Sequence, residues 1–546
     1  MTNSVLNQRV SIYTLVLLPL VTLTISPWAN FDSINLPKFA ILVIGACLIV
    51  GTSLAARPLH FIQDNNLSKV MIFFLSAMVL NLFTHGFGAR QFFGTYGSNF
   101  GFITFLCLAV IYMISANTFS LKYYYRLLIA LAITGLINLI YGALQFLELD
   151  PIKWNNDFDK IIGTLGNPNF ISSLLGISSV ACLALVMNQQ RAPLRILLIS
   201  ASFGMVLLAL LSNSIQGVFA AGAGFLALFY CKILRGAGPY LQVTYFSSVS
   251  LIVLLTIAGI FNKGPFQEFI YGNSVVARTF YWNAAIEMAK AEPITGFGFD
   301  SYGEYYRLYR SENAASLFGP DLVANSSHNW LLDILVFGGL PLFLSFIALL
   351  FLTLRTAVRL LLKRRKFDAI GSGLISCWIA SIAQSMVSTP QLGLAVWFWS
   401  LSGAVIGYDL LLQDPTDTKK LLHRSIIPPL TPVLSTIGVS LGVLLVAFPV
   451  SKDIHFRRAV EFQDAKQIIM AATRWPSEVY YKNYAAELFL ASELTDNSLR
   501  MAQEAAATNQ NSAVAWRLII ANPKVSVNEK ERALTQMERI DPYFKR

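Results

Sequence analysis

Long apolar runs recur along the whole chain and limit what it can fold into. A helix rises about 1.5 Å per residue, so about 17 to 25 apolar residues cross the roughly 30 Å hydrocarbon core of a bilayer. We predict thirteen such spans and therefore an all-α, polytopic transmembrane helical bundle. The predicted spans cover residues 10–28, 37–55, 68–84, 101–117, 124–145, 168–187, 194–212, 215–232, 241–261, 329–354, 367–387, 391–412 and 427–450. The shortest polar breaks, around Ser212 and Thr389, also fit a re-entrant hairpin or an interrupted helix.

The composition excludes a soluble globular protein of this length. Hydrophobic residues make up 55% of the chain and charged residues only 13%. The formal net charge of +11 does not indicate nucleic-acid binding, because much of it lies in short loops between spans. We expect membrane lipids to be partners and nucleic acid not to be one.

The basic residues of the short loops predict how the spans are oriented. They fall in alternate loops, and an excess of Lys and Arg marks the cytoplasmic side. They are Arg9, Arg57, Lys69, Lys122, Arg126, Arg191, Arg195, Lys232, Arg235, Arg355, Arg359, Lys363, Arg364, Arg365, Lys366, Lys419, Lys420 and Arg424. The amino terminus is therefore predicted to be cytoplasmic. Because the number of spans is odd, everything after Ser451 is predicted to lie outside.

The amino-terminal segment and the reactive side chains give no sign of processing or of a metal site. Residues 20–28 offer no small-residue cleavage site, so we expect the first helix to be retained. The five cysteines lie within or beside spans without paired spacing, and the five histidines form no HxxxH or HEXXH pattern. We expect neither a disulfide framework nor a metal or other cofactor.

Four regions follow from this pattern. Residues 1–261 hold nine spans, residues 262–328 form a long polar outer loop, and residues 329–450 hold four more spans. Residues 451–546 are charged and Ala-rich, with helical periodicity interrupted near 475–478 and 508–513. This outward-facing region resembles degenerate tetratricopeptide (TPR-like) helix pairs. It is either a docking surface for a partner or acceptor, or a helical cap that packs on the membrane part.

The long outer loop carries an arginine on a predicted helix. A cap at Asn273 and Ser274, followed by residues 275–291 and a proline, predicts that helix. Arg278, Tyr281 and Trp282 lie on its neighbouring faces. A guanidinium beside aromatic residues at a membrane surface suits a phosphate ligand, because it donates to two oxygens and keeps its charge. The alternative is a lipid-headgroup anchor with an interfacial Trp.

A single histidine, His328, stands where the loop meets the next span. Asn325, Ser326 or Ser327 is predicted to cap that helix and to place His328 in its first turn. The amides and dipole of a helix start attract anions and disfavour an imidazolium. A neutral imidazole can accept a proton from a hydroxyl, so His328 is a candidate general base. The alternative is a capping or headgroup-contacting histidine.

Several short segments, taken in order, resemble the bacterial O-antigen ligase and Wzy-type polymerase superfamily. They are Val276-Ala277-Arg278 with Trp282, Pro293-Ile294-Thr295-Gly296-Phe297-Gly298, Ser327-His328-Asn329-Trp330, Phe337-Gly338-Gly339-Leu340-Pro341-Leu342 and, upstream, Gly163-Thr164-Leu165-Gly166-Asn167-Pro168-Asn169-Phe170. The resemblance spans roughly residues 90 to 450, and many relatives carry a helical repeat domain at the carboxyl end.

The resemblance implies a metal-independent glycosyltransferase of the bacterial cytoplasmic membrane. Such enzymes move a glycan from undecaprenyl diphosphate to a hydroxyl acceptor on the outer face, with inversion at the anomeric carbon. It implies that Arg278 holds the diphosphate and that His328 activates or orients the acceptor. Asn167, Asn169, Gln216, Trp282 and Asn329 are the further residues that we expect to bind substrate.

Two departures from the family pattern concern the second phosphate contact. Ligases of this group usually carry an arginine where this chain has Gln216, and relatives often have an arginine where the segment 94–99 has serine. A neutral amide does not replace the charge. The candidates for the missing contact are Arg90, Arg307 and Arg310, unless the substrate itself differs.

Other functions stay open at this point. Within the superfamily the alternatives to a ligase are a Wzy-type polymerase and a protein O-oligosaccharyltransferase. From another class, a polysaccharide transporter or flippase would need ionisable residues deep in the spans, which here hold almost none beyond Lys38 and Asp333 near their ends. A non-catalytic scaffold that presents the carboxyl-terminal helices is the third possibility.

Overall fold

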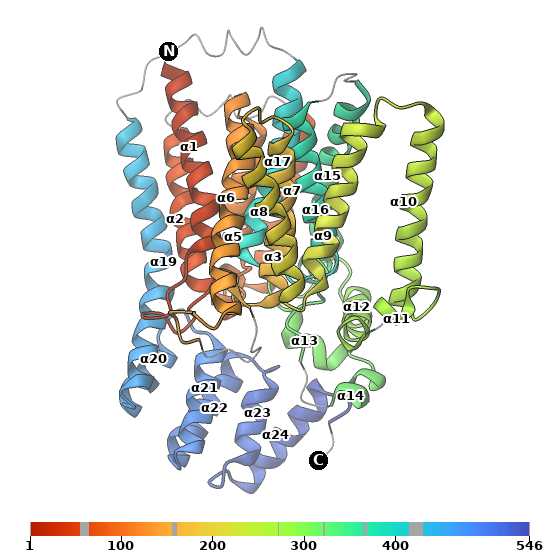
Figure 1. The fold of residues 1–546 in the computed structure, drawn as a ribbon. Coiled ribbons are helices and arrows are strands. Elements are labelled where there is room, and N and C mark those ends of the chain that lie inside the picture. The colour runs from red at the N-terminus through yellow and green to blue at the C-terminus, as the bar shows by residue number, and fades with distance from the viewer. Residues whose placement is uncertain are drawn as a thin grey trace.

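The computed structural model describes residues 2–54, 65–118, 120–154, 161–270, 272–319, 323–363, 368–413 and 430–544. Every regular element in these ranges is a helix, and the apolar helices run side by side as a bundle (Figure 1). The prediction of an all-α polytopic bundle is therefore confirmed. Of the basic positions used to orient the spans, Arg57, 364–366, Lys419, Lys420 and Arg424 lie outside the described residues.

A helix stands at each of the thirteen predicted spans. Ten are long and apolar enough to cross a membrane, and three are shorter apolar helices, at Gln8–Leu23, Phe102–Ala116 and Ala369–Ser385. The thirteen are α1 (Thr2–Leu23), α2 (Asn35–Leu54), α3 (Asn65–His85), α5 (Phe102–Ala116), α6 (Leu121–Phe146), α7 (Pro168–Val186), α8 (Ala192–Leu211), α9 (Ile215–Phe229), α10 (Pro239–Ile260), α15 (Trp330–Lys363), α16 (Ala369–Ser385), α17 (Leu392–Gln413) and α19 (Thr431–Glu461). A five-residue π-helix, Tyr230–Leu234, continues α9. The polar breaks at Ser212 and Thr389 both separate two helices.

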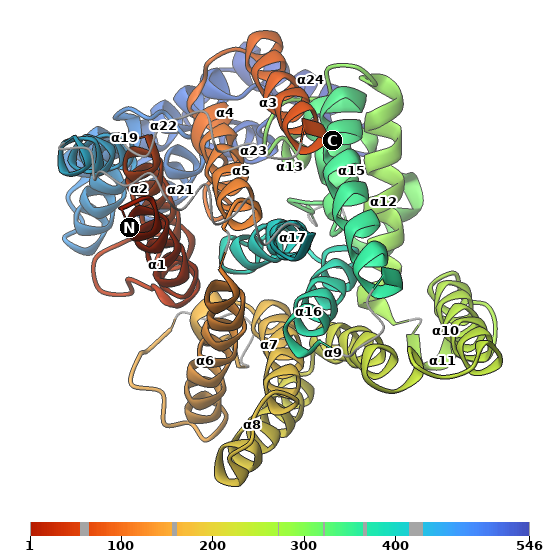
Figure 2. The ribbon, with the colours of Figure 1, turned by 90° about the horizontal axis from the view of Figure 1, so that it is seen from above.

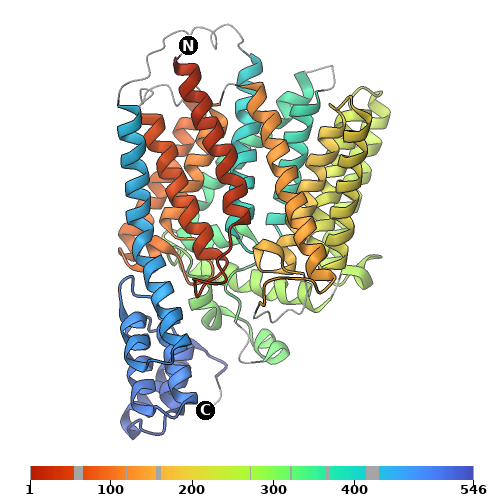
Figure 3. The same cartoon turned by 60° about the vertical axis from the view of Figure 1, so that its left-hand side comes forward.

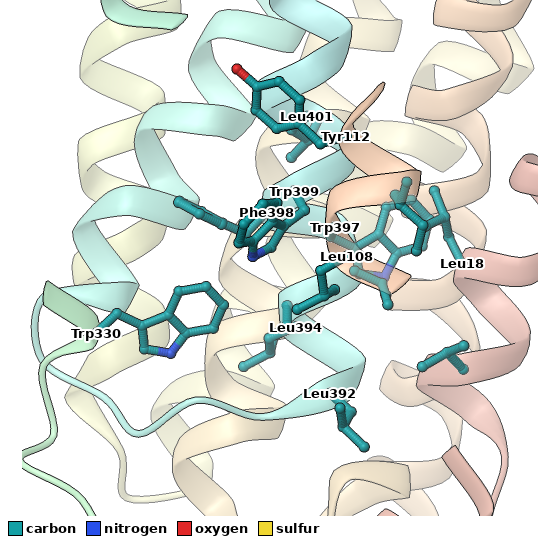
Figure 4. Close-up of a cluster of buried hydrophobic side chains, with 14 of the residues drawn as sticks. Leu18, Leu108, Tyr112, Trp330, Leu392, Leu394, Trp397, Phe398, Trp399 and Leu401 are labelled. Carbon is teal, nitrogen blue, oxygen red and sulfur yellow. The ribbon is translucent and has the colours of Figure 1, made fainter. Parts of the chain in front are cut away.

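Helix α17 is the axis of the bundle. It lies among α1, α5, α6, α15 and α16 when the molecule is viewed from above (Figure 2). Trp397 and Trp399 on α17 are at most 1% exposed. The Trp399 ring packs against Tyr112 of α5, and Phe398 packs against Trp330 (Figure 4). Burial of such large side chains supplies much of the packing energy of a bundle core.

The loops of the bundle alternate between its two ends. The amino terminus lies at one end, whereas α12, α13 and the carboxyl-terminal helices lie at the other (Figures 1 and 3). The long polar loop holds four helices: α11 (Gln267–Ile270), α12 (Asn273–Ala291), α13 (Tyr302–Tyr309) and α14 (Glu312–Phe318). Helix α12 runs across the end of the bundle, roughly perpendicular to the spans (Figures 1 and 2). Its N-cap residue is Gly272 without a side-chain cap, so the predicted cap at Asn273 and Ser274 is wrong.

A backbone clip joins the polar loop to a kink in α15. Phe297 N donates to the Val336 carbonyl at 2.8 Å, and Leu340 N donates to the Pro293 carbonyl at 2.8 Å. The helix is irregular at Gly338 and Gly339, which frees these backbone groups for the loop. Gly339 has φ +60°, and a Cβ there would lie 2.4 Å from the Ile294 carbonyl oxygen. Only glycine adopts this left-handed backbone conformation without strain and fits beside the Ile294 carbonyl without a clash.

The last helices form a second packed cluster on the same end as α12. They are α20 (Ala465–Thr473), α21 (Val479–Ala491), α22 (Thr495–Thr508), α23 (Ala513–Ala521) and α24 (Val527–Ile540), and successive helices pack side by side. Their core has its own buried residues, including Phe456 of α19. Helix α19 therefore crosses the expected boundary at residue 451 without a break. Its Asp453 accepts hydrogen bonds from Phe31 N at 2.7 Å and from the Tyr481 hydroxyl at 2.8 Å.

We predict that Gly339→Ala lowers the stability of the folded protein. An alanine there combines a left-handed backbone with a clash against the Ile294 carbonyl, which together cost about 1 to 3 kcal/mol or more. Thermal unfolding in detergent would show a lower midpoint. Gly222→Ala in α9 is the matched control, because a Cβ at Gly222 meets nothing within 4 Å. Equal midpoints for Gly339→Ala and the wild type would contradict the role of the clip.

Candidate functional site

A loop held by a buried carboxylate presents His328. Asp333, in the first turn of α15 and fully buried, accepts hydrogen bonds from Ser326 Oγ and Ser327 N, both at 2.7 Å. The Asn329 Oδ1 accepts from the amides of Leu331 and Leu332 and so caps the helix. His328 precedes this cap with φ +57°, and its amide donates to Ser326 Oγ at 3.0 Å.

The prediction that Asn325, Ser326 or Ser327 caps the helix and that His328 lies in its first turn is therefore wrong. Ser326 and Ser327 bond the loop and Asp333 instead, so the helix starts at Trp330, later than expected. His328 occupies the left-handed backbone region just outside the helix. Asn329 therefore accepts the hydrogen bonds of the first helix amides, and these amides are not free to bind an anion beside the imidazole.

The surroundings of His328 keep its ring uncharged. The imidazole is half-buried and stacks on Tyr281 of α12, with ring centroids 5.4 Å apart and an interplanar angle of 27°. Burial, and to a smaller degree the positive charge of Arg278, together lower the pKa of His328 to about 4. At neutral pH the ring is therefore a neutral imidazole that can accept a proton.

Arg278 places a cation next to this imidazole. Its side chain is 9% exposed, one helical turn before Tyr281, and one guanidinium nitrogen donates weakly to the Ser274 carbonyl at 3.4 Å. Burial lowers the pKa of Arg278, and Nε has no hydrogen-bond partner among the described residues. The Trp282 Nε1 on the same helix is also buried without a partner within the described ranges. A buried cation whose donors are not satisfied favours an anionic ligand.

A cavity of about 570 Å³ opens beside His328. Its walls come from segments far apart in the sequence, which meet at the α12 end of the bundle. The lining residues include Asn35, 95–98, Asn167, Asn169, Phe170, Gln216, Tyr281, Asp300, 323–326, His328, 388–391 and Tyr480. The structure thus brings together four of the predicted site residues: His328, Asn167, Asn169 and Gln216.

The amides on the cavity wall are held in place by local hydrogen bonds. Asn167 caps α7 by accepting from the Asn169 amide at 2.9 Å, and Asn169 Oδ1 accepts from Ser214 Oγ at 2.8 Å. Gln216 Nε2 donates to the Val387 carbonyl at 3.2 Å, while its buried Oε1 has no partner among the described residues. Gln216 therefore presents a neutral acceptor at the wall, where the family resemblance predicts an arginine.

The arginines considered for the second phosphate contact hold other partners. Arg90 Nε lies 3.2 Å from Glu304. Arg307 and Arg310 lie 3.1 and 2.7 Å from the same carboxylate, that of Asp541 just after α24. None of the three lines the cavity beside His328, although Arg307 lines a neighbouring one. Asn329 and Trp282 also lie outside the lining.

Sequence reasoning gave no role to Asp300 and Tyr480 on the cavity wall. Asp300 accepts hydrogen bonds from Thr95 N, Thr95 Oγ1 and Ser98 Oγ at 2.7 to 3.0 Å, and burial raises its pKa. Asp300 has φ +55° and lies in the Gly-rich turn of residues 296–303. Nothing in the sequence of that turn indicated that Thr95 and Ser98 would be its partners. Tyr480 belongs to α21 and reaches the cavity only through tertiary packing. Tyr281 was detectable, because it lies one turn from Arg278 on the same helix.

Comparison with known proteins gives one family match. The family profile described as O-Antigen ligase matches residues 171–347. This match over residues 171–347 supports the O-antigen ligase and Wzy superfamily. The matched segment contains Gln216, Arg278 and His328, whereas the walls at 95–98, 388–391 and Tyr480 lie outside it. The chain matches no curated protein. The apolar helices and this family match together indicate an integral membrane protein.

We predict that the ring of His328 takes up a proton only near pH 4. Its pKa in the folded protein lies below the ordinary value of 6.5, so the neutral form dominates above about pH 5. Removing the nearby cation with Arg278→Gln should raise the midpoint, because one of the two causes of the shift is lost. NMR titration of isotope-labelled histidine, assigned with His328→Gln, measures it. A titration midpoint of His328 at or above pH 6.5 in the wild type would contradict the predicted lowering of its pKa.

We predict that Asp541→Asn loosens α24 from the polar loop. The substitution removes the carboxylate that two buried guanidinium groups share, which costs about 3 to 5 kcal/mol. Hydrogen exchange in α24 and in α13 should accelerate together. Lys524→Ala, which removes the exposed ion pair with Asp496, is the control and should leave both helices protected. Unchanged protection in Asp541→Asn would show that the pair does not hold the two parts together.

Proposed function

We propose that this protein transfers a glycan from undecaprenyl diphosphate to a hydroxyl acceptor. The observation that carries the proposal is a neutral imidazole on the wall of a polar cavity, with an arginine close enough to depress its pKa. An incoming hydroxyl needs a base, and a diphosphate leaving group needs positive charge. The family match over residues 171–347 supports the same reaction class.

Each bond change has a residue assigned to it. The acceptor oxygen attacks the anomeric carbon of the donor glycan while its proton passes to the neutral His328 ring. The bond between the anomeric carbon and the phosphate oxygen breaks, and its electron pair leaves with the undecaprenyl diphosphate. Arg278 stabilises the charge that develops on that diphosphate. Direct displacement of this kind inverts the configuration at the anomeric carbon.

We infer a direction of approach for the donor from the position of Arg278. Helix α12 runs across the bundle end (Figure 2), and Arg278 lies on it one turn before Tyr281, which lines the cavity together with His328. A lipid-linked donor entering from the bilayer along α12 would place its diphosphate at Arg278 and its sugar toward His328. The acceptor would then enter from the polar side of the cavity, where the amides of Asn167, Asn169 and Gln216 lie.

The proposal includes the cellular setting. We place the protein in the bacterial cytoplasmic membrane, with the amino terminus in the cytosol and with residues 262–328 and 451–546 outside. The separation of the amino terminus from α12 and α20–α24 at opposite bundle ends supports this assignment. A glycan ligase is the function that we favour. A polymerase or a protein O-oligosaccharyltransferase would use the same two side chains with a different acceptor.

We predict that His328→Ala and Arg278→Ala each abolish transfer. Loss of a general base costs about 10²- to 10⁴-fold in rate, and loss of the cation removes charge stabilisation of the leaving group. The measurement is product formation by purified protein in detergent from a defined undecaprenyl-diphosphate glycan and candidate hydroxyl acceptors. Thermal unfolding checks that both variants are folded.

Two exposed residues on α19 provide matched controls. His455→Ala and Arg458→Ala remove the same side-chain types outside the cavity and should leave the rate unchanged. Wild-type turnover by His328→Ala or by Arg278→Ala would refute the catalytic assignment. Loss of activity in the controls to the same degree would show that the assay reports general damage.

A further inference from the structure

A second cavity, of about 220 Å³, lies between the polar loop and the carboxyl-terminal helices. One wall is formed by Gly303, Glu304 and Arg307 of α13, and the other by residues of α21 and of the turn before α23. We call this cavity the α13–α23 groove. No predicted role involved this space, because only tertiary packing brings its walls together.

The α13–α23 groove adjoins the cavity of His328. Six residues line both spaces, which places them at the junction between the two. They are Thr95, Tyr96, Asp300, Val323, Asn325 and Tyr480. A chain molecule that reacts at His328 can therefore extend past this junction into the α13–α23 groove.

The polar lining of the groove suits an uncharged ligand rich in hydroxyls. Side-chain amides of Asn325, Asn483, Asn509 and Asn511 offer both donors and acceptors. The buried Asn483 Oδ1 accepts no hydrogen bond from the described residues, while its Nδ2 donates to Ser512 Oγ at 3.1 Å. This unsatisfied acceptor belongs to an amide that is held in place, so a hydroxyl group of a ligand can donate a hydrogen bond to it.

The charged residues of the groove already have partners in the protein. Asp300 accepts hydrogen bonds from Thr95 and Ser98. Glu304 pairs with Arg90 at 3.2 Å, and Arg307 pairs with Asp541 at 3.1 Å. Glu478 caps α21 by accepting from the Tyr480 amide at 2.7 Å. Because these charges are compensated, the groove has no strong preference for an anion or a cation. This favours a neutral saccharide over a charged peptide.

A stacked pair of tyrosines stands at the junction. The rings of Tyr96 and Tyr480 are parallel within 3°, with centroids 3.8 Å apart. Tyr480 remains 37% exposed, so it contributes an aromatic surface beside the amides. An apolar ring next to hydrogen-bonding side chains matches a sugar, which has polar edges and apolar C–H faces.

We propose that the α13–α23 groove binds an oligosaccharide chain attached to one of the two substrates of the site. The inference rests on the proposed glycan transfer and assigns the carboxyl-terminal helices a role as one wall of a saccharide subsite. Both a donor glycan and a glycan acceptor share this chemistry. Kinetics therefore has to distinguish the two sources.

The test uses the full-length protein in detergent and separates binding from transfer. The probe is a fluorescently labelled, lipid-free oligosaccharide released from the cell-envelope polysaccharide of the source cells, with binding followed by anisotropy. Val514→Trp fills the groove from a 40% exposed position on α23. Val527→Trp is the matched control, since Val527 is 79% exposed and lies outside the groove. Asn483→Ala removes the amide with less change in volume.

We expect Val514→Trp to weaken binding at least tenfold, Asn483→Ala to weaken it several-fold, and both Val527→Trp and His328→Ala to bind as the wild type does. In the transfer assay, Val514→Trp should raise KM for the substrate whose sugar occupies the groove, donor or acceptor, with a smaller effect on kcat. If the wild type binds the oligosaccharide but transfers no glycan, the proposed function is contradicted and the saccharide subsite is not.

Three results would overturn the saccharide subsite. They are undiminished binding by a folded Val514→Trp, absence of oligosaccharide binding by the wild type, and saturable binding of Ser- and Thr-rich peptides in place of the oligosaccharide. Thermal unfolding of each variant decides whether a loss of binding reflects the groove or a loss of fold.

Discussion

The candidate site depends on the hydrogen bonds by which Asp333 holds the loop of residues 326–328. A fully buried carboxylate at the start of α15 is costly unless donors surround it, and Ser326 and Ser327 supply them. The same bonds force the chain into the left-handed turn at His328. The imidazole thereby faces the cavity and Tyr281, and burial beside Arg278 keeps it neutral. One satisfied carboxylate thus sets the position and the protonation state of the proposed base.

Two long-range attachments bring the remaining walls to this loop. The backbone clip at Gly339 fixes the Gly-rich turn to α15, and Asn81 of α3 donates to the Phe337 carbonyl at 2.7 Å from the other side. On the polar side, Asp541 holds Arg307 and Arg310 across 234 and 231 residues of sequence. The carboxyl-terminal helices are therefore part of the site's architecture and not an appended module. This agrees with the interpretation of that region as a helical cap that packs on the membrane part, and docking of a partner or acceptor stays a prediction.

Local patterns predicted the parts of the site that belong to one helix or one loop. Arg278 and Tyr281 were placed together because helical spacing alone brings them to one side. The cap of α15 was missed by a few positions, since Ser326, Ser327 and Asn329 are all capping residue types, and only Asp333 decides which of them bonds the loop. Arg307 and Arg310 looked available for phosphate because their partner lies more than 200 residues away.

The amino-acid sequence by itself determined that this is an all-helical membrane bundle with thirteen apolar helices and a polar loop carrying Arg278 and His328. Hydrophobic run length and helical period are local properties, and a bilayer leaves the backbone few other ways to satisfy its hydrogen bonds. Only the tertiary structure decided which side chains share the cavity and which arginines are already paired. Both depend on buried contacts between segments that are far apart in the sequence. These contacts form, and contribute their free energy, only in the folded chain.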